Sequence, residues 1–168
     1  MNEFSSIPLL DGSALAEGRN LRALARDFAD AYGNVGFAYL VNHGVDDALV
    51  QDVFAANRSF HAQPLAAKMR VALDQNHRGY IPLNTSTDVN SRLATVTKPN
   101  QSESFMMMRE DATTDDKVYL SGPNQWPDLP GFRATLTAYH DQLAQLGHRL
   151  LQVALLAMGA ADMAGMAA

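Results

Sequence analysis

The five histidines are the side chains in this chain best suited to hold a metal ion, because the chain contains no cysteine. They are His43, His61, His77, His140 and His148. His140 and His148 share one predicted helix, where a rise of about 1.5 Å per residue separates them by about 12 Å, too far for one ion with bonds of about 2 Å. We interpret His43, which follows a predicted strand, as a hydrogen-bonded turn residue. A site that joins His61 and His77 through the fold stays open.

Composition and charge limit the classes of partner. The chain has 168 residues and a net charge of −5, and its Lys and Arg are scattered, which argues against nucleic-acid binding. The lack of cysteine excludes disulfides and thiolate chemistry and suits a cytoplasmic location. The first residues lack the pattern of a signal peptide. The apolar run from Leu150 to Met158 is shorter than the ~20 residues of a membrane span, so no membrane partner is expected.

Hydrophobic periodicity predicts the elements that would position these residues. We expect short strands near 7–10 and 37–41, and helices near 14–32, 46–61 and 131–158. Gly33 is expected to end the first helix, Asp46 to cap the second and Gly159 to cap the third. The third helix carries the strongest signal, because its apolar residues alternate spacings of four and three from Phe132 to Val153.

Residues 74–130 show weak periodicity and many turn-forming residues, which is typical of a segment that is either functional or disordered. The aromatic residues embedded in it, Tyr80, Phe105, Tyr119 and Trp126, favour order. We interpret Trp126 as an anchor of an irregular loop on the helices, and Met106 to Met108 as core or strand.

Six segments stand out in sequence order. They are Ile7-Pro-Leu-Leu-Asp11, the stretch from Gly36 to Gly44, His77-Arg-Gly-Tyr80, Ser102-Glu-Ser-Phe105, Gly122-Pro-Asn-Gln-Trp-Pro127 and the helix from Phe132. In this order and spacing they resemble the amino-terminal region of the isopenicillin N synthase-like 2-oxoglutarate/Fe(II) oxygenases. Ser102 departs from the pattern, because that family commonly has a basic residue there.

The resemblance implies a cofactor chemistry for which this chain lacks the residues. The family holds Fe(II) with a His-x-Asp pair and a distant His, and it binds 2-oxoglutarate with an Arg-x-Ser pair. None of the five histidines starts a His-x-Asp or His-x-Glu sequence. In the family these ligands come from a double-stranded β-helix that follows the long helix. We therefore expect no catalytic residue, metal ligand or cofactor within this chain.

The resemblance also implies candidates for substrate binding. In the family the loop after the second helix helps to enclose the substrate, which makes Arg78, Tyr80, Asn84, Ser86 and Thr87 the candidate residues. The alternative is structural. In that case Gly79 makes a turn, the Tyr80 side chain packs in the interior and Arg78 is solvated.

These observations predict an α+β fold, the helical amino-terminal layer of a jelly-roll oxygenase without the barrel, spanning residues 1–168. The parent protein would be a dioxygenase acting on a small molecule, and this chain alone would be inactive. The second hypothesis is a stand-alone accessory or interaction module derived from the family. In either case strand edges and apolar helix surface would be left for the missing barrel or for self-association.

Overall fold

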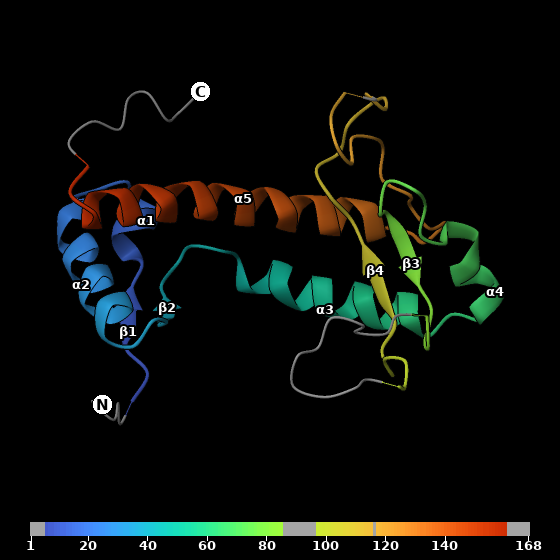
Figure 1. The fold of residues 1–168 in the computed structure, drawn as a ribbon, viewed down its shortest axis with the longest axis horizontal. Coiled ribbons are helices and arrows are strands. Elements are labelled where there is room, and N and C mark those ends of the chain that lie inside the picture. Colours follow the sequence, from blue (N-terminus) through green and yellow to red (C-terminus); the bar gives the residue numbers. More distant parts are fainter. Residues whose placement is uncertain (1–5, 86–96, 116, 161–168) are drawn as a thin grey trace. The chain divides into compact units, whose positions relative to one another are not determined.

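The structure is a computed structural model that describes residues 6–85, 97–115 and 117–160, and its fold is α+β (Figure 1). In chain order the elements are β1 (Leu9–Asp11), α1 (Ser13–Glu17), α2 (Leu21–Asn34), β2 (Tyr39–Val41), α3 (Asp47–His61), α4 (Leu65–Lys68), the 3-10 helix η1 (Met69–Val71), β3 (Gly79–Ile81), β4 (Ser104–Met106) and α5 (Phe132–Ala157). The chain divides into two compact units. The first contains Met1–Asp52 and Leu136–Ala168, and the second contains Val53–Thr135.

The first unit is built on a parallel pair of strands joined by helices. β1 and β2 pair with Leu10 opposite Leu40. The connection between them contains α1 and α2, as parallel strands require a crossover rather than a tight turn. The backbone N–H of Gly12 donates to the carbonyl of Val41 at 2.7 Å and extends the pairing by one step.

The core of the first unit is apolar and draws on β1, α1, α2, β2 and α5. Its buried members are Leu10, Leu15, Leu24, Ala25, Ala31 and Val153. The α5 residues Leu146 and Leu150 pack against them, which accounts for the apolar stripe along the second half of that helix. Arg149, also on α5, donates to the carbonyl of Leu15 at 3.0 Å, so α5 is tied to α1 by a hydrogen bond as well as by packing.

The helix predicted over 14–32 is wrong as a single element. Gly18 has a φ of 65° and ends α1, because the N–H groups of Gly18 and Arg19 turn back to the carbonyls of Leu15 and Ala14. Gly33 does not end the second piece, since α2 continues to Asn34. The chain leaves α2 through Gly36, whose φ is 94°.

Two predicted caps are confirmed. The Asp46 carboxylate accepts the N–H of Ala48 at 2.9 Å in the first turn of α3. Gly159 has a φ of 81° after α5, and the N–H of the next residue, Ala160, returns to the carbonyl of Leu155. Within the described part of the chain, every helix is too short or too polar to serve as a membrane span.

The second unit contains an antiparallel strand pair that the periodicity did not predict. β3 and β4 pair with Tyr80 opposite Phe105. Aromatic side chains form the interior beside this pair: the ring of Phe60, which is fully buried, lies 5.8 Å from that of Tyr80 and 5.1 Å from that of Phe105. Phe132, the first residue of α5, joins the cluster at 5.4 Å from Phe60.

Gly79 allows the backbone of β3 to approach its neighbours closely. A Cβ atom at this position would lie 2.4 Å from the carbonyl oxygen of Val71 and 2.9 Å from that of Ala72, and φ is 116°. Both facts exclude a larger residue without movement of the backbone.

Substitution of Gly79 provides a test of this packing. We expect Gly79→Ala to lower the free energy of unfolding by about 2–4 kcal/mol, because the new methyl group meets backbone atoms that cannot move aside and φ is unfavourable. The matched control is Gly33→Ala in α2, where a Cβ meets nothing within 4 Å and helix propensity predicts a gain of up to about 1 kcal/mol. Urea unfolding measures both, and equal effects at the two positions would contradict the packing described.

Candidate functional site

Segments far apart in the sequence meet around Arg78 in the second unit. The side chain of Arg78 is only 1% exposed, and its guanidinium donates to the carbonyl oxygens of Leu120, Asn76 and Arg109. The carboxylate of Asp111 lies 3.9 Å away. Arg78 therefore fixes the loop that runs from Arg109 to Gly122 through backbone carbonyls more than through an ion pair.

Gln125 joins the same region from the segment 122–127. Its side-chain amide donates to the carbonyl of Ala72 at 2.6 Å and to that of Arg78 at 2.7 Å. These two carbonyl groups thereby receive hydrogen-bond donors beside Gly79, where the backbone approaches that of Val71 and Ala72 closely.

A carboxylate, Glu103, forms the second centre of the unit. It accepts from the ammonium of Lys68 at 2.6 Å and from the hydroxyl of Tyr80. The Nδ1 atom of His61 lies 3.2 Å from its other oxygen. Lys68 also donates to the carbonyl of His61 at 3.1 Å, at the end of α3. We call Lys68, Tyr80, Glu103 and His61 the carboxylate junction, because one carboxylate links α3, α4 and β3 to the start of β4.

Hydrogen bonds and burial shift the pKa values of Glu103, Lys68 and Tyr80 away from neutral pH. The hydrogen bonds from Lys68 and Tyr80 lower the pKa of Glu103 to about 2. The hydrogen bond to Glu103 raises the pKa of Lys68, and burial raises the pKa of Tyr80. Each shift moves the group away from neutrality, whereas a general acid or base needs a pKa near the working pH. Glu103, Lys68 and Tyr80 are therefore suited to structural support rather than proton transfer.

A second carboxylate, Glu110, organises the segment around Trp126. Burial raises the pKa of Glu110, but hydrogen bonds from the Trp126 indole and the Asn124 side chain and backbone outweigh burial, so the net pKa is lowered. The Asn124 side chain exchanges two hydrogen bonds with the backbone of Met108, at 2.9 and 2.8 Å. Trp126 also packs 6.4 Å from the ring of Phe132, as expected for a loop anchor.

The five candidate substrate-binding residues occupy different environments. Arg78 and Tyr80 are buried with internal partners, so Arg78 is not solvated as the structural alternative assumed. Asn84 is exposed, and its N–H donates to the carbonyl of Asn100 at 3.1 Å. Ser86 and Thr87 lie outside the described residues. Contact of these residues with a substrate stays a prediction.

The histidines were the candidate metal ligands in the sequence. The prediction for His43 is confirmed, because its Nδ1 accepts the N–H of Val45 at 3.1 Å. Across residues 6–85, 97–115 and 117–160, no three His, Asp or Glu side chains gather as metal ligands. The described residues therefore do not fit an Fe(II) centre.

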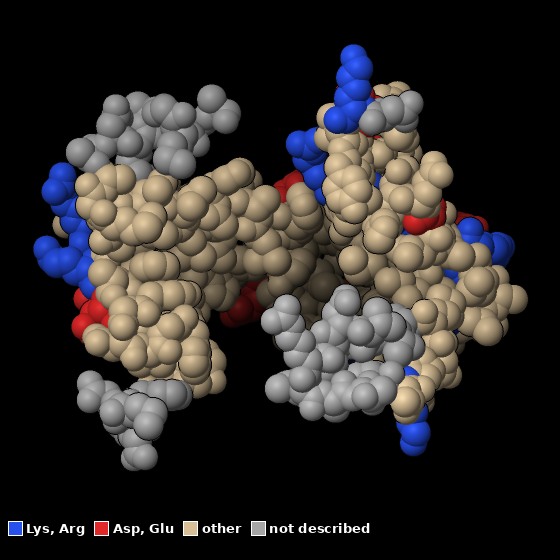
Figure 2. All heavy atoms as spheres, in the orientation of Figure 1, with Lys and Arg blue, Asp and Glu red and all other residues tan. Residues whose placement is uncertain are grey.

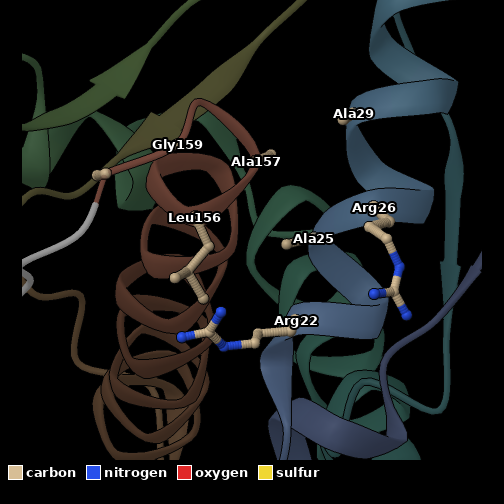
Figure 3. A pocket seen from close by; sticks show the side chains of 8 residues that line it. Arg22, Ala25, Arg26, Ala29, Leu156, Ala157 and Gly159 are labelled. Carbon is tan, nitrogen blue, oxygen red and sulfur yellow. The ribbon is translucent and has the colours of Figure 1, made fainter.

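A concave feature of the first unit lies between α2 and the end of α5. It is a pocket of about 470 Å³ lined by Arg22, Ala25, Arg26, Ala29, Leu156, Ala157, Gly159 and Ala160. The side chains of Arg22 and Arg26 leave α2 in different directions, so their guanidinium groups do not converge on one point (Figure 3). On the face shown in Figure 2, Lys and Arg likewise occupy separate places rather than one stripe.

Residues 7–129 match the family described as the N-terminal region of the non-haem dioxygenase in morphine synthesis. The chain belongs to the family of N-terminal regions found in the 2-oxoglutarate/Fe(II) oxygenases. It is 33% identical over 129 residues to a 2-oxoglutarate-dependent dioxygenase, caaD, of Aspergillus niger, an alignment that covers 74% of this chain and 38% of the relative. It is 28% identical to a flavone synthase of Petroselinum crispum over 94% of this chain and 41% of the relative.

Solved oxygenases share the fold. A full-length Neurospora crassa protein, solved in complex with alpha-ketoglutarate, matches with a TM-score of 0.72 and 27% identity over 95% of this chain and 49% of its own. A putative 2-oxoglutarate/Fe(II) oxygenase family protein of Caulobacter crescentus matches with a TM-score of 0.75 and 21% identity over 93% of this chain and 50% of its own. The chain thus spans about two fifths of the curated relatives and about half of these two solved structures.

Sequence reasoning missed Lys68, which helps to build this region. Lys68 gave no signal, because a lysine on a short helix is usually solvated, yet here its side chain is 8% exposed. Lys68 supplies a cation to Glu103, the residue after Ser102, from a position 35 residues earlier. The signal that could have found the pair is Glu103 itself, a carboxylate two residues before Phe105, one of the aromatic residues taken as a sign of order.

The pKa of Glu103 predicts an acid dependence of stability. A folded pKa of about 2, against an ordinary value of 4.5, means that the junction stabilises the fold fully above about pH 4.5 and progressively less as pH falls toward 2. We expect Glu103→Gln to lower the free energy of unfolding by about 2 kcal/mol at neutral pH, and this deficit to shrink as the pH falls from about 6 to 3.

Urea unfolding at several pH values measures this deficit. The control is Asp128→Asn, an exposed carboxylate for which a change within about 0.5 kcal/mol is expected at every pH. A deficit for Glu103→Gln that stays constant down to pH 3 would contradict the depressed pKa.

Proposed function

We propose that this chain is the N-terminal part of a non-haem Fe(II)/2-oxoglutarate-dependent oxidoreductase, in which it supports a jelly-roll barrel and helps to enclose a small-molecule substrate. The family match over residues 7–129 is the observation that carries the proposal. Residues 1–168 would form the N-terminal domain of that enzyme, and Fe(II) and 2-oxoglutarate would be held outside them.

The partner of the chain would be the barrel. Apolar side chains of the first unit are available for such a contact: Leu9 on β1 and Tyr39 on β2 are 65% and 60% exposed, and Leu151 on α5 is 50% exposed. Apolar area is worth roughly 25 cal/mol per Å², so leaving a few hundred Å² of it in water costs several kcal/mol. Without a barrel, the same surface would promote self-association.

For the substrate-facing role we propose Asn84, Ser86 and Thr87 as contact residues, with Arg78 and Tyr80 acting by holding the adjoining backbone. The burial of Arg78 and Tyr80 and the exposure of Asn84 support this division. A cytoplasmic location is proposed from the lack of cysteine, which suits a reducing compartment.

An activity assay on the purified 168-residue chain tests the division of labour. We expect it to release no succinate from 2-oxoglutarate and to lose added Fe(II) to a chelator, because the ligand set is missing. A relative with both domains serves as positive control. Stoichiometric iron after chelation, or succinate release, would overturn the proposal.

The alternative function is a stand-alone accessory or interaction module derived from the same family. The DNA that follows codon 168 discriminates the two. A continuing reading frame that encodes His-x-Asp, a distant His and Arg-x-Ser supports the oxygenase. A stop codon, together with a stable complex between this chain and another protein in cells, would favour the accessory module.

A further inference from the structure

The long connection between β3 and β4 is held at its base by paired hydrogen bonds. The strands pair Tyr80 with Phe105 and Ile81 with Ser104. Beyond them the N–H of Asn84 donates to the carbonyl of Asn100 at 3.1 Å, and the side chain of Gln101 donates to that of Asn84. We call residues 82–85 and 97–103 the two arms, and they run side by side from the strands to Asn84.

The carboxylate junction sits where the arms leave the strands. Tyr80 belongs to β3, Glu103 directly precedes β4, and the hydroxyl of Tyr80 donates to the Glu103 carboxylate. Lys68 then connects both residues to the interior, because its ammonium binds Glu103 at 2.6 Å and lies 5.1 Å from the centroid of the Tyr80 ring. Glu103, the last residue of the second arm, therefore joins that arm to α4 and to β3, from which the first arm continues.

The strands alone are too short to fix the arms. Each has three residues, whereas strands in stable sheets commonly have five or six. The side-chain contacts of Glu103 thus have to supply order that the backbone ladder does not. A charge-assisted hydrogen bond is roughly twice as strong as a neutral one, and this carboxylate accepts one from Lys68.

We propose that Glu103 is a positioning residue that holds the two arms together and so presents Asn84 to the substrate. The holding of the arms stands on the contacts above, whereas the presentation of Asn84 to a substrate rests on the proposed function. Glu103 acts through the arms and does not itself touch the ligand.

Amide hydrogen exchange on the 168-residue chain tests the holding of the arms. In Glu103→Gln we expect the amide of Asn84 to exchange at least about tenfold faster, because its acceptor Asn100 moves with the other arm. The amides of Gly12 and Tyr39, bonded to Val41 and Pro8 in the first unit, should keep their parent rates and so report that the rest of the chain is intact. The exposed-site variant Asp128→Asn is the matched control and should change none of these rates.

A second variant keeps the test decisive if Glu103→Gln does not fold. Tyr80→Phe retains the packed ring and removes only the hydroxyl donor, so a smaller acceleration at Asn84 is expected. Unchanged exchange of Asn84 in the folded variants would overturn the proposal.

Kinetics test the presentation of Asn84 separately. In an oxygenase that contains this chain and a barrel, Asn84→Ala and Glu103→Gln should each raise the KM for the organic substrate several-fold. The KM for 2-oxoglutarate should stay unchanged. Parent KM values in both variants would overturn the role of Asn84. Failure of the proposed function looks different: no polypeptide that contains this chain would turn over 2-oxoglutarate, while the exchange of Asn84 would still respond to Glu103.

Discussion

The second unit depends on one carboxylate that has been taken largely out of water. Glu103 is 23% exposed and Lys68 8% exposed, and burial of either charge alone would be costly. The cost is offset only while the ammonium, the Tyr80 hydroxyl and the carboxylate stay in hydrogen-bonding contact. These groups come from α4, β3 and the residue before β4. The hydrogen bonds between them therefore fix the relative positions of those elements.

The same principle, that polar groups near the interior must find partners, shapes the rest of the unit. The carboxylate of Asp111 lies 3.9 Å from Arg78, and the guanidinium donates hydrogen bonds to the carbonyl oxygens of Arg109 and Leu120. Asn124 pairs with the backbone of Met108 as a neighbouring strand would. Irregular backbone is thus satisfied by side chains where no ladder is available, which is how a segment with short strands keeps a defined structure.

Local patterns in the sequence predicted the helices whose formation depends on residues close together in the chain. The stripe that includes Leu146, Leu150 and Val153 predicted α5, and Asp46 predicted the start of α3, because helix periodicity and capping involve residues within a few positions. The pairing of β3 with β4 was not predicted, since three residues are too few to show an alternation, and only Met106 of β4 lay in a segment interpreted as core or strand. Gly18 and Gly33 looked alike in the sequence, yet only Gly18 takes the left-handed conformation that ends a helix.

The site was harder to predict because its contacts are non-local. Arg78 could be interpreted as substrate-facing or solvated, and two of the three carbonyls that accept from it belong to residues more than thirty positions away. The family resemblance located the segments 77–80, 102–105 and 122–127 but not their contacts with one another. Of the aromatic residues taken as signs of order, Tyr80 packs inside whereas Tyr119 is 87% exposed.

A double-mutant cycle between Tyr80 and Glu103 tests the central claim most directly. The free energies of unfolding of the parent, Tyr80→Phe, Glu103→Gln and the double variant give the coupling between the hydroxyl and the carboxylate. A shared junction predicts a coupling of about 1 kcal/mol or more, because the second change removes a contact that the first has already broken. Additive effects, within about 0.3 kcal/mol, would contradict the claim that this carboxylate organises the unit.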